Sequence, residues 1–300
     1  MINDAHCHFF SQRFFDTLAQ QKGLSGEHRS AALTKHLEWD DPGSAAALSD
    51  RWVSELDRYQ VGRSSLIASI PGDEDSVAEA VSRHPTRFVG FFMVDPTADQ
   101  ATERLTRTLT HPGMRCACLF PAMHRYALTD ERVLKFVDVL AGQPGTTLFV
   151  HCGMLSVGVR KKLGLPNRFE MRFGNPLDLQ LIASTRTSLP IIIPHFGAGL
   201  LREALMVADA CPNIYLDTSS SNGWLKYHPG LTLTQVFRQA LAVAGPDRLL
   251  FGTDSSFFPR GWQHVVHEQQ HAIVESLGVD ETVVSRIFGG NFDRLFPRPA

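Results

Sequence analysis

Short apolar runs alternate with longer segments of helical periodicity along most of the chain. The apolar runs are rich in β-branched and aromatic residues, and their polar residues lie mainly at their ends. This pattern is typical of parallel strands that are buried on both faces. We expect strands at residues 2–8, 64–70, 87–96, 115–122, 146–153, 190–197, 213–220 and 248–256.

Between these runs, apolar residues recur at helical spacing, and several of the segments end at Gly or Pro. The expected helices are 49–62, 77–85, 98–109, 130–142, 176–185, 200–211, 233–245 and 262–278. Strands joined by crossover helices predict a parallel sheet. Eight such units in 300 residues predict an α/β fold, the closed (β/α)8 TIM barrel. The alternative is an open doubly wound sheet, but no GxGxxG turn follows the first strand.

One segment interrupts this alternation. Residues 9–48 separate the first strand from its expected helix and contain two short stretches of helical character. A connection of this length is usually functional or has structure of its own. We interpret it as a long insertion after strand 1 that forms a lid over the site; a packing insertion or an oligomer contact is the alternative. With no linker or repeat in view, residues 1–300 are expected to form a single domain.

The composition narrows the functional classes. The chain is 43% hydrophobic with a net charge of −2, so it has no strong field for nucleic acid or an anionic membrane. Neither a long apolar span nor a secretory signal is recognisable. The five cysteines lack the number and spacing of a disulfide framework, so we expect a cytoplasmic protein. Homo-oligomerisation stays open.

Polar residues at the ends of the expected strands indicate chemistry. They are His6 and His8 on the first strand, His151 on the fifth, His195 on the sixth and Asp254 on the eighth. The carboxyl ends of barrel strands meet at one face, where enzymes of this fold have their active sites. A single histidine on a strand is usually a hydrogen-bonded core or surface residue. Five candidate ligands at one face favour a metal site instead.

The spacing of the first pair supports this interpretation. Residues i and i+2 point to the same side of a strand, so His6 and His8 can face the barrel axis while Cys7 faces the helices. Two neutral imidazoles can bind one divalent ion. His151 and Asp254 could complete the site, and a water in its open position would have a lowered pKa. His195 is either a further ligand or the base that takes a proton from that water.

These residues resemble the signature of the amidohydrolase superfamily, which has HxH on strand one, His on strands five and six, and Asp on strand eight. The amidohydrolase-2 group is especially similar; it includes aminocarboxymuconate semialdehyde decarboxylase, resorcylate-type decarboxylases and lactonases. The resemblance covers nearly the whole chain except 9–48. It is carried by the stretches DAHCHFF, SRHPTRFVGFFMVDP, TLFVHCG, PIIIPHFGAG, PNIYLDTSS and LLFGTDSSFFPRG.

The resemblance implies roles for individual residues. His6, His8, His151 and Asp254 would bind zinc or a similar divalent ion such as manganese. His195 would be hydrogen-bonded to the metal water, and Asp254 would also accept a proton, which makes these two the catalytic residues. Members that bind two metals bridge them with a Lys or Glu on strand four. This chain has RCACLFPAMHRY there, so one ion is expected.

Three functions fit this scheme. The first is a mononuclear metal-dependent hydrolase that cleaves a C–O or C–N bond in a small carboxylated substrate. The second is a non-oxidative decarboxylase on the same frame, because one scaffold supports both reactions. The third is a non-catalytic metal-binding barrel. The family's decarboxylases carry extra arginines after the strand-six histidine, and HFGAGLLREALMVADAC does not match them closely, which favours hydrolysis.

Residues in the loops suggest how a carboxylate would bind. A guanidinium group suits a substrate carboxylate, and Arg260 is six residues from Asp254. The loop after strand five also carries cations, of which Lys161 and Lys162 are expected to be solvated surface charges. The candidate substrate-binding residues are Arg260, His124, Tyr126, Trp262 and Arg172.

Overall fold

The computed structural model describes residues 1–26, 28–220 and 222–299 and is an α/β barrel. Its wall has eight parallel strand positions, which we call staves. The first stave has two pieces, and both pair with β3. The strands are β1 (Ile2–Asp4), β2 (His8–Phe9), β3 (Val61–Ala68), β4 (Phe88–Val94), β5 (Met114–Leu119), β6 (Thr147–Val150), β7 (Ile191–Ile193), β8 (Ile214–Asp217) and β9 (Leu249–Leu250). They pair in this order, all parallel, as the alternating sequence pattern predicted.

The barrel closes between the first stave and the segment that follows β9. Ala5 donates its backbone N–H to the carbonyl of Phe251 at 2.8 Å, and His8 donates to Ser255 at 2.7 Å. Cys7 and Ser255 form a parallel bridge in the same region. The alternative of an open doubly wound sheet is therefore wrong.

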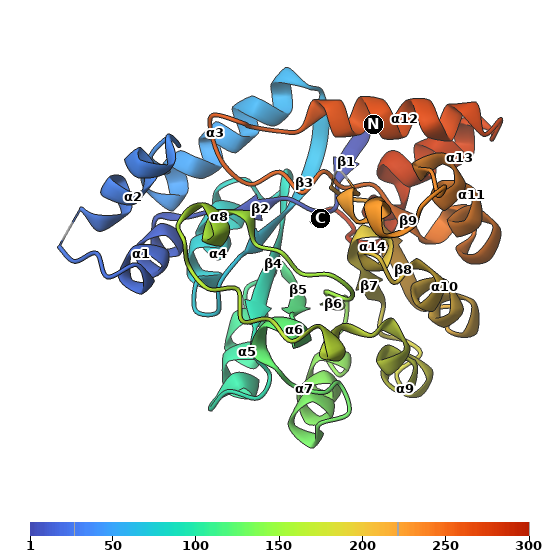
Figure 1. Cartoon of the computed structure of the whole chain (residues 1–300), viewed down its shortest axis with the longest axis horizontal. Helices are drawn as coiled ribbons and strands as arrows, with labels where there is room; N and C mark the ends of the chain where they lie inside the picture. Colours follow the sequence, from blue (N-terminus) through green and yellow to red (C-terminus); the bar gives the residue numbers. More distant parts are fainter. Residues whose placement is uncertain (27, 221, 300) are drawn as a thin grey trace.

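Helices surround the barrel, and most of them connect one strand to the next along the chain (Figure 1). The expected helices are present with shifted ends. The longer helices are α3 (Ala45–Arg58), α4 (Glu74–Arg83), α5 (Ala101–Leu109), α7 (Glu131–Ala141), α10 (Leu201–Ala210), α11 (Leu233–Ala244) and α12 (His264–Ser276). Shorter ones are α6 (Pro121–His124), α8 (Gly158–Lys162), α9 (Gln180–Thr185), α13 (Glu281–Ser285) and α14 (Asn291–Leu295). Among the described residues, every helix is too short or too polar to cross a membrane.

The apolar residues of the strands divide between two cores. On β4, Phe88 and Phe92 pack in the layer between strands and helices, whereas Phe91 and Met93 point into the barrel. The same alternation places Cys7 in the outer layer, as the sequence predicted. Burial on both faces explains why the strands read as continuous apolar runs.

Residues 9–48 are not an irregular loop. They contain α1 (Gln12–Gln21) and α2 (Arg29–Leu37), which lie at one side of the barrel in Figure 1. A third hydrophobic cluster holds them, with Phe14 and Leu33 from these helices, Trp39, and Val159 from α8. The expected long insertion is therefore not evident as a separate unit, because its helices pack beside the barrel and against α8.

A buried carboxylate, Asp73, joins the start of α1 to the start of α4. It accepts hydrogen bonds from the hydroxyls of Ser11 and Ser76, both at 2.6 Å, and Ser11 in turn caps α1 by accepting from the N–H of Phe14. Burial raises the pKa of Asp73 from its ordinary 3.8 to about 6, although the two serine hydrogen bonds oppose this shift.

This raised pKa predicts a pH dependence of stability. The contribution of Asp73 is fully present below pH 3.8 and is lost as the pH rises through about 6, because the folded state disfavours the ionised form. The Asp73→Asn variant does not lose stability in this way, because an amide does not ionise. From about pH 4 to about pH 7.5, the unfolding free energy of the variant should therefore gain about 2 kcal/mol relative to wild type.

Denaturant unfolding at both pH values measures the difference. The matched control is Asp75→Asn, which removes an exposed carboxylate two residues away. Parallel pH profiles for wild type and Asp73→Asn would contradict the prediction.

Candidate metal centre

Two histidines meet where the first stave ends. The imidazoles of His6 and His8 point to the same side, and their Nε2 atoms are 3.4 Å apart. His6 is 1% exposed, and Ser69 at the end of β3 lies 2.7 Å from Nδ1 of His8. The Nε2 atom of each ring is therefore the one directed at its neighbour, as expected for two side chains that bind one ion.

Asp254 reaches the same point from the closing segment. Its backbone N–H donates to the carbonyl of His6 at 2.8 Å, and its φ of 60° lies in the left-handed region. Oδ1 is 3.2 Å from Nε2 of His8 and 3.7 Å from Nε2 of His6. A strained backbone held by barrel closure thus places a carboxylate beside both imidazoles.

These three side chains fit a divalent ion. Ligands about 2.05 Å from a tetrahedral zinc are roughly 3.3 Å from one another, and the three separations here are 3.2, 3.4 and 3.7 Å. Two imidazole nitrogens and a carboxylate oxygen are also a donor set that zinc and manganese accept. His6, His8 and Asp254 therefore form a candidate metal site.

His195 lies next to this group, in the turn Pro194–Gly197 that follows β7. Its ring centroid is 4.9 Å from that of His6. Its Nδ1 is 3.2 Å from the carbonyl of Ser219, which can only accept, so Nδ1 carries the proton and Nε2 is free to act. Burial lowers the pKa of His195, which keeps the ring neutral and able to accept a proton.

His151, the last of the four histidines predicted at the site, follows β6 directly. Its ring centroid is 5.3 Å from His195 and 5.4 Å from Phe120. It contributes no atom to the compact group of three ligands. Its buried Nδ1 has no hydrogen-bond partner among the described residues, and burial lowers its pKa well below the usual range. An orphaned neutral imidazole beside the group is consistent with a fourth ligand.

The loops that carry His151 and His195 are packed backbone to backbone. Gly153 has a φ of 72°, and a Cβ at this position would lie 2.1 Å from the carbonyl oxygen of Gly197. Only glycine permits this approach. The two histidines are thereby held by loops with no space between them.

Electrostatics keep Asp254 ionised. Burial raises its pKa, but the hydrogen bond from His8 and the charges of the neighbouring histidines outweigh burial and hold the pKa below its ordinary value. Burial lowers the pKa of His8. At His6, by contrast, burial is outweighed by the carboxylates of Asp217 and Asp254, which raise the pKa. A metal ion binds neutral imidazoles, so it would compete with a proton at His6.

Sequence reasoning missed two residues at the end of β8. Asp217 lies 2.7 Å from Nδ1 of His6, and the hydroxyl of Ser219 lies 2.8 Å from Nδ1 of His195. Both are fully buried. The available signal was an acid that ends an apolar strand, in IYLD followed by TSS.

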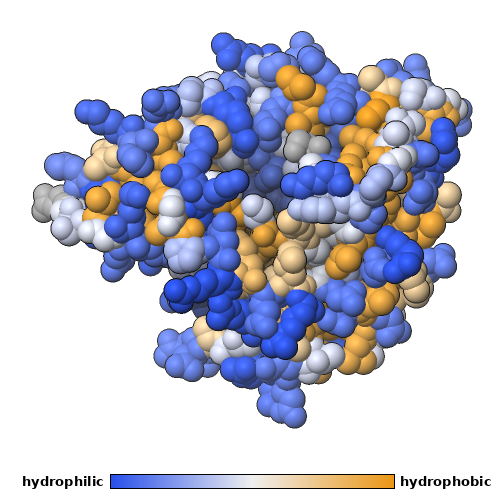
Figure 2. All heavy atoms as spheres, viewed as in Figure 1, coloured by the Kyte–Doolittle hydropathy of each residue, from blue (hydrophilic) through white to orange (hydrophobic). Residues whose placement is uncertain are grey.

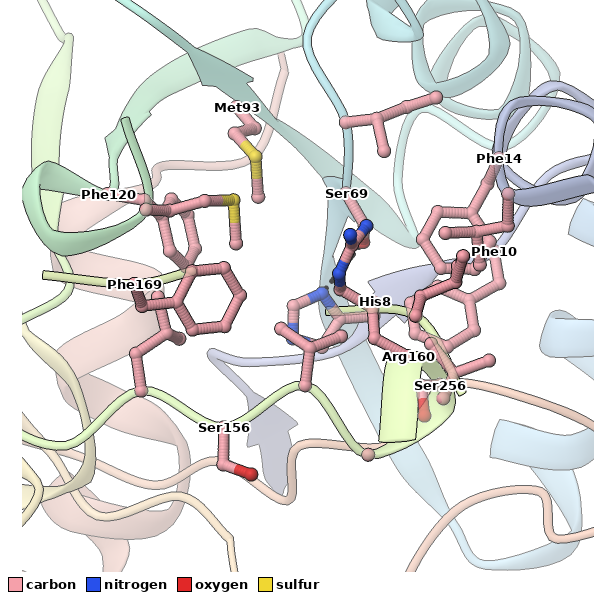
Figure 3. A pocket seen from close by; sticks show the side chains of 18 of the residues that line it. His8, Phe10, Phe14, Ser69, Met93, Phe120, Ser156, Arg160, Phe169 and Ser256 are labelled. Carbon is pink, nitrogen blue, oxygen red and sulfur yellow. Dashed lines mark hydrogen bonds between the residues drawn. The ribbon is translucent and has the colours of Figure 1, made fainter. Parts of the chain in front are cut away.

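A cavity of about 1070 Å³ opens above the centre, and His6, His8, His151, His195 and Asp254 all line it. Figure 2 shows this face hollowed near its middle, with hydrophilic residues around the hollow. In Figure 3, Met93, Phe120 and Phe169 lie along one side of the cavity, Phe10 and Phe14 lie along the other, and His8 and Ser69 are between them. The walls are thus largely apolar and aromatic.

Five cations line the same cavity: Arg125, Arg160, Lys162, Arg168 and Arg260. None of them forms an ion pair within the described part of the chain, where their hydrogen bonds go to neutral acceptors. Asp254 is the one acid among the described lining residues. Lys161 and Lys162 are both exposed, as the sequence predicted, and Lys162 also borders the cavity, with Nζ 5.5 Å from the ring of Trp39.

The predicted substrate-binding residues divide into two groups. Arg260 and His124 line the cavity. Arg260 donates to the hydroxyl of Ser256 at 2.7 Å and to the carbonyl of Asp254 at 3.2 Å, and its guanidinium lies over Phe257. It is therefore held beside the candidate centre.

The other three lie away from the cavity. The indole of Trp262 is 2% exposed and donates to buried Asp4 at 2.7 Å, so it is a structural residue. Tyr126 is buried in the layer between strands and helices, because the turn after α6 directs it inward. Arg172 is exposed and paired with Glu170 at 2.8 Å. None of these three lines the cavity above the centre.

Solved structures of low sequence identity share the fold over nearly the whole chain. They include 5-carboxyvanillate decarboxylase from Sphingomonas paucimobilis, at a TM-score of 0.67 and 16% identity over 99% of both chains. A probable 2-pyrone-4,6-dicarboxylic acid hydrolase from Acinetobacter baumannii, with citric acid bound, gives 0.61 and 16% over 98% of both. An amidohydrolase from Burkholderia multivorans with bound zinc gives 0.64 and 16% over 100% of both. At these identities the likeness shows the fold alone.

Sequence comparison identifies the family. The protein fluG of Emericella nidulans is 26% identical over 170 residues, which are 55% of this chain and 18% of fluG, so the match spans under a fifth of that protein. The amidohydrolase family model matches residues 4–298, from the first strand to the last helix and through every residue of the centre. The chain therefore belongs to the amidohydrolase family.

Proposed function

We propose that the protein is a mononuclear metal-dependent hydrolase of the amidohydrolase or lactonase type. It cleaves a C–O or C–N bond in a small carboxylated substrate. The observation that carries the proposal is the convergence of His6, His8 and Asp254 beside His195, at the base of a cavity lined by unpaired cations. His151 is proposed as a further ligand. The ion is zinc, with manganese as the alternative.

One ion rather than two is supported by the fourth stave. β5 ends in Leu119 and is followed by Phe120, so neither an acid nor a lysine stands at its carboxyl end. A divalent ion bound at this centre supplies a Lewis acid that polarises a carbonyl and lowers the pKa of a water molecule.

The chain's own residues supply the remaining steps. The free Nε2 of neutral His195 accepts a proton from the attacking water as its oxygen adds to the substrate carbonyl carbon. The same proton then goes to the leaving oxygen or nitrogen as the C–O or C–N bond breaks. Asp254, an ionised carboxylate beside His8, is the alternative acceptor of this proton.

Substrate orientation is assigned to the cations. Arg260 is fixed by Ser256 and by the Asp254 carbonyl, and it can receive a substrate carboxylate close to the centre. His124 is a second candidate contact at the cavity wall. The cations of the α8 segment can attract the anionic substrate at the cavity rim.

Decarboxylation is the second candidate function. It is favoured by the aromatic walls, which suit a flat aromatic acid, and by the fold shared with 5-carboxyvanillate decarboxylase. Hydrolysis is preferred because the turn after β7 contributes His195 but no cation to the cavity. A panel of lactones and hydroxybenzoates separates the two: hydrolysis gives a ring-opened acid, and decarboxylation releases CO2.

The first test concerns the ion. Purified protein should contain close to one divalent ion per chain, and Asp254→Asn should bind zinc at least about tenfold more weakly, because one anionic ligand is lost. Turnover should fall with it. Metal analysis and chelator competition measure both effects, with Glu131→Gln, an 88% exposed carboxylate, as control.

A wild-type protein that neither contains nor binds zinc or manganese would contradict the proposed function. Bound metal without turnover of any panel compound, together with no exchangeable water at the ion, would favour the non-catalytic barrel.

The second test concerns substrate binding. Arg260→Met should raise KM for a carboxylated substrate by about 10- to 100-fold, because a charge-assisted hydrogen bond contributes about 1.5–3 kcal/mol. Arg172→Met is the matched control and should leave KM unchanged, since that side chain is exposed and paired with Glu170. Equal effects of the two substitutions would remove Arg260 from the proposed role.

A further inference from the structure

The exit of β8 makes contacts that the proposed chemistry does not use. Asp217, the last residue of the strand, and Ser219, two residues later, are both 0% exposed. They lie behind His6 and His195, on the side of the rings away from the three-ligand group. Completely buried polar groups at this position need a specific reason to be there.

Asp217 uses both of its carboxylate oxygens as acceptors. Oδ2 is 2.7 Å from Nδ1 of His6, and Oδ1 accepts the backbone N–H of Ser219 at 2.6 Å. A carboxylate cannot donate, so Nδ1 of His6 must carry its proton. In the neutral ring the lone pair is then on Nε2, the atom that faces His8 and Asp254.

Ser219 has the same effect on His195. Its carbonyl is 3.2 Å and its hydroxyl is 2.8 Å from Nδ1 of that ring. The hydroxyl is also 3.0 Å from Nδ1 of His6, so one residue touches the rear nitrogen of both histidines. The lone pair of His195 is therefore also on Nε2.

Coordination of a second ion by Asp217, His6 and His195 is a competing interpretation, since their ligand atoms also lie within 4.8 Å. The geometry opposes it. Two ligands of a tetrahedral zinc are roughly 3.3 Å apart, whereas Asp217 and His6 are 2.7 Å apart. That separation is a short hydrogen bond.

We propose that Asp217 is a positioning residue that fixes the Nδ1–H tautomer of His6, and that Ser219 fixes the same tautomer of His195. Both rings thereby present Nε2 to the centre before any ion or substrate arrives. The consequence of this assignment for metal affinity rests on the proposed function. The tautomer itself is a property of the metal-free chain.

The test is Asp217→Asn, which keeps the size of the side chain. Both oxygens of Asp217 face N–H donors, so an amide must point its NH2 group at one of them. If the NH2 group faces Ser219, it lies against the backbone N–H of that residue, and two donors repel each other. If the NH2 group faces His6, it needs an acceptor at Nδ1. The ring proton of His6 then moves to Nε2, where it prevents that nitrogen from binding a metal ion.

The expected results are two. In metal-free wild type, at a pH high enough that both rings are neutral, nitrogen-15 NMR of the imidazoles should show His6 and His195 as Nδ1–H forms. His6 should change to Nε2–H in Asp217→Asn. Zinc affinity from chelator competition should fall by about 10- to 100-fold. Asp247→Asn, an exposed carboxylate, is the control for charge. Ser219→Ala, which keeps the carbonyl, should leave His195 as Nδ1–H.

Several outcomes would overturn the proposal. They are an Nε2–H form of His6 in wild type, unchanged zinc affinity and tautomer in Asp217→Asn, or two zinc ions in wild type of which one is lost in the variant. The wild-type NMR measurement decides the question even if the variant fails to fold. A chain that binds no zinc but shows both Nδ1–H forms would contradict the proposed function and leave this inference standing.

Discussion

The hydrogen bonds that close the barrel are the constraint on which the candidate centre depends. Asp254 donates its backbone N–H to His6, and His8 donates to Ser255, so the first stave and the segment after β9 are joined at the level of the ligands. Without this closure the carboxylate of Asp254 would have no fixed place beside the two imidazoles. The same bonds are part of the sheet, so the geometry of the site is stabilised by the cooperative folding of the barrel.

The surroundings of the centre have two separate tasks. Behind the histidines, buried acceptors such as Asp217 and Ser219 hold the rings in one orientation. In front of them, apolar walls and unpaired cations define what can enter. Most of these cations are exposed at the rim of the cavity, so their attraction for an anionic group acts through water and is screened by salt.

The sequence predicted the barrel well because the signal was repeated. Each stave is apolar on both faces, and each is followed by a helix, so errors at single boundaries did not change the topology. It was less successful at 9–48, where helices α1 and α2 pack beside the barrel and against α8. Contacts between segments so distant in the chain leave no periodic trace in either of them.

The residues of the candidate site also divide into those that a local pattern reveals and those that depend on distant contacts. HxH, the histidines that follow β6 and β7, and Asp254 could be found from the sequence, since polar residues at the ends of apolar strands are conspicuous. Loop residues could not be sorted in this way. Arg260 and Trp262 are two positions apart, yet one lines the cavity and the other donates to buried Asp4.

By itself, the sequence determined the fold class and the face of the barrel where the candidate ligands meet, because strand alternation and parallel topology follow from local patterns of apolar residues. Only the tertiary structure decided which ligand atoms meet within bonding range of one ion, and which nitrogen of each histidine is free. It also decided which loop cations face the cavity. Those properties depend on barrel closure and on side-chain contacts between distant segments, and no local pattern encodes them.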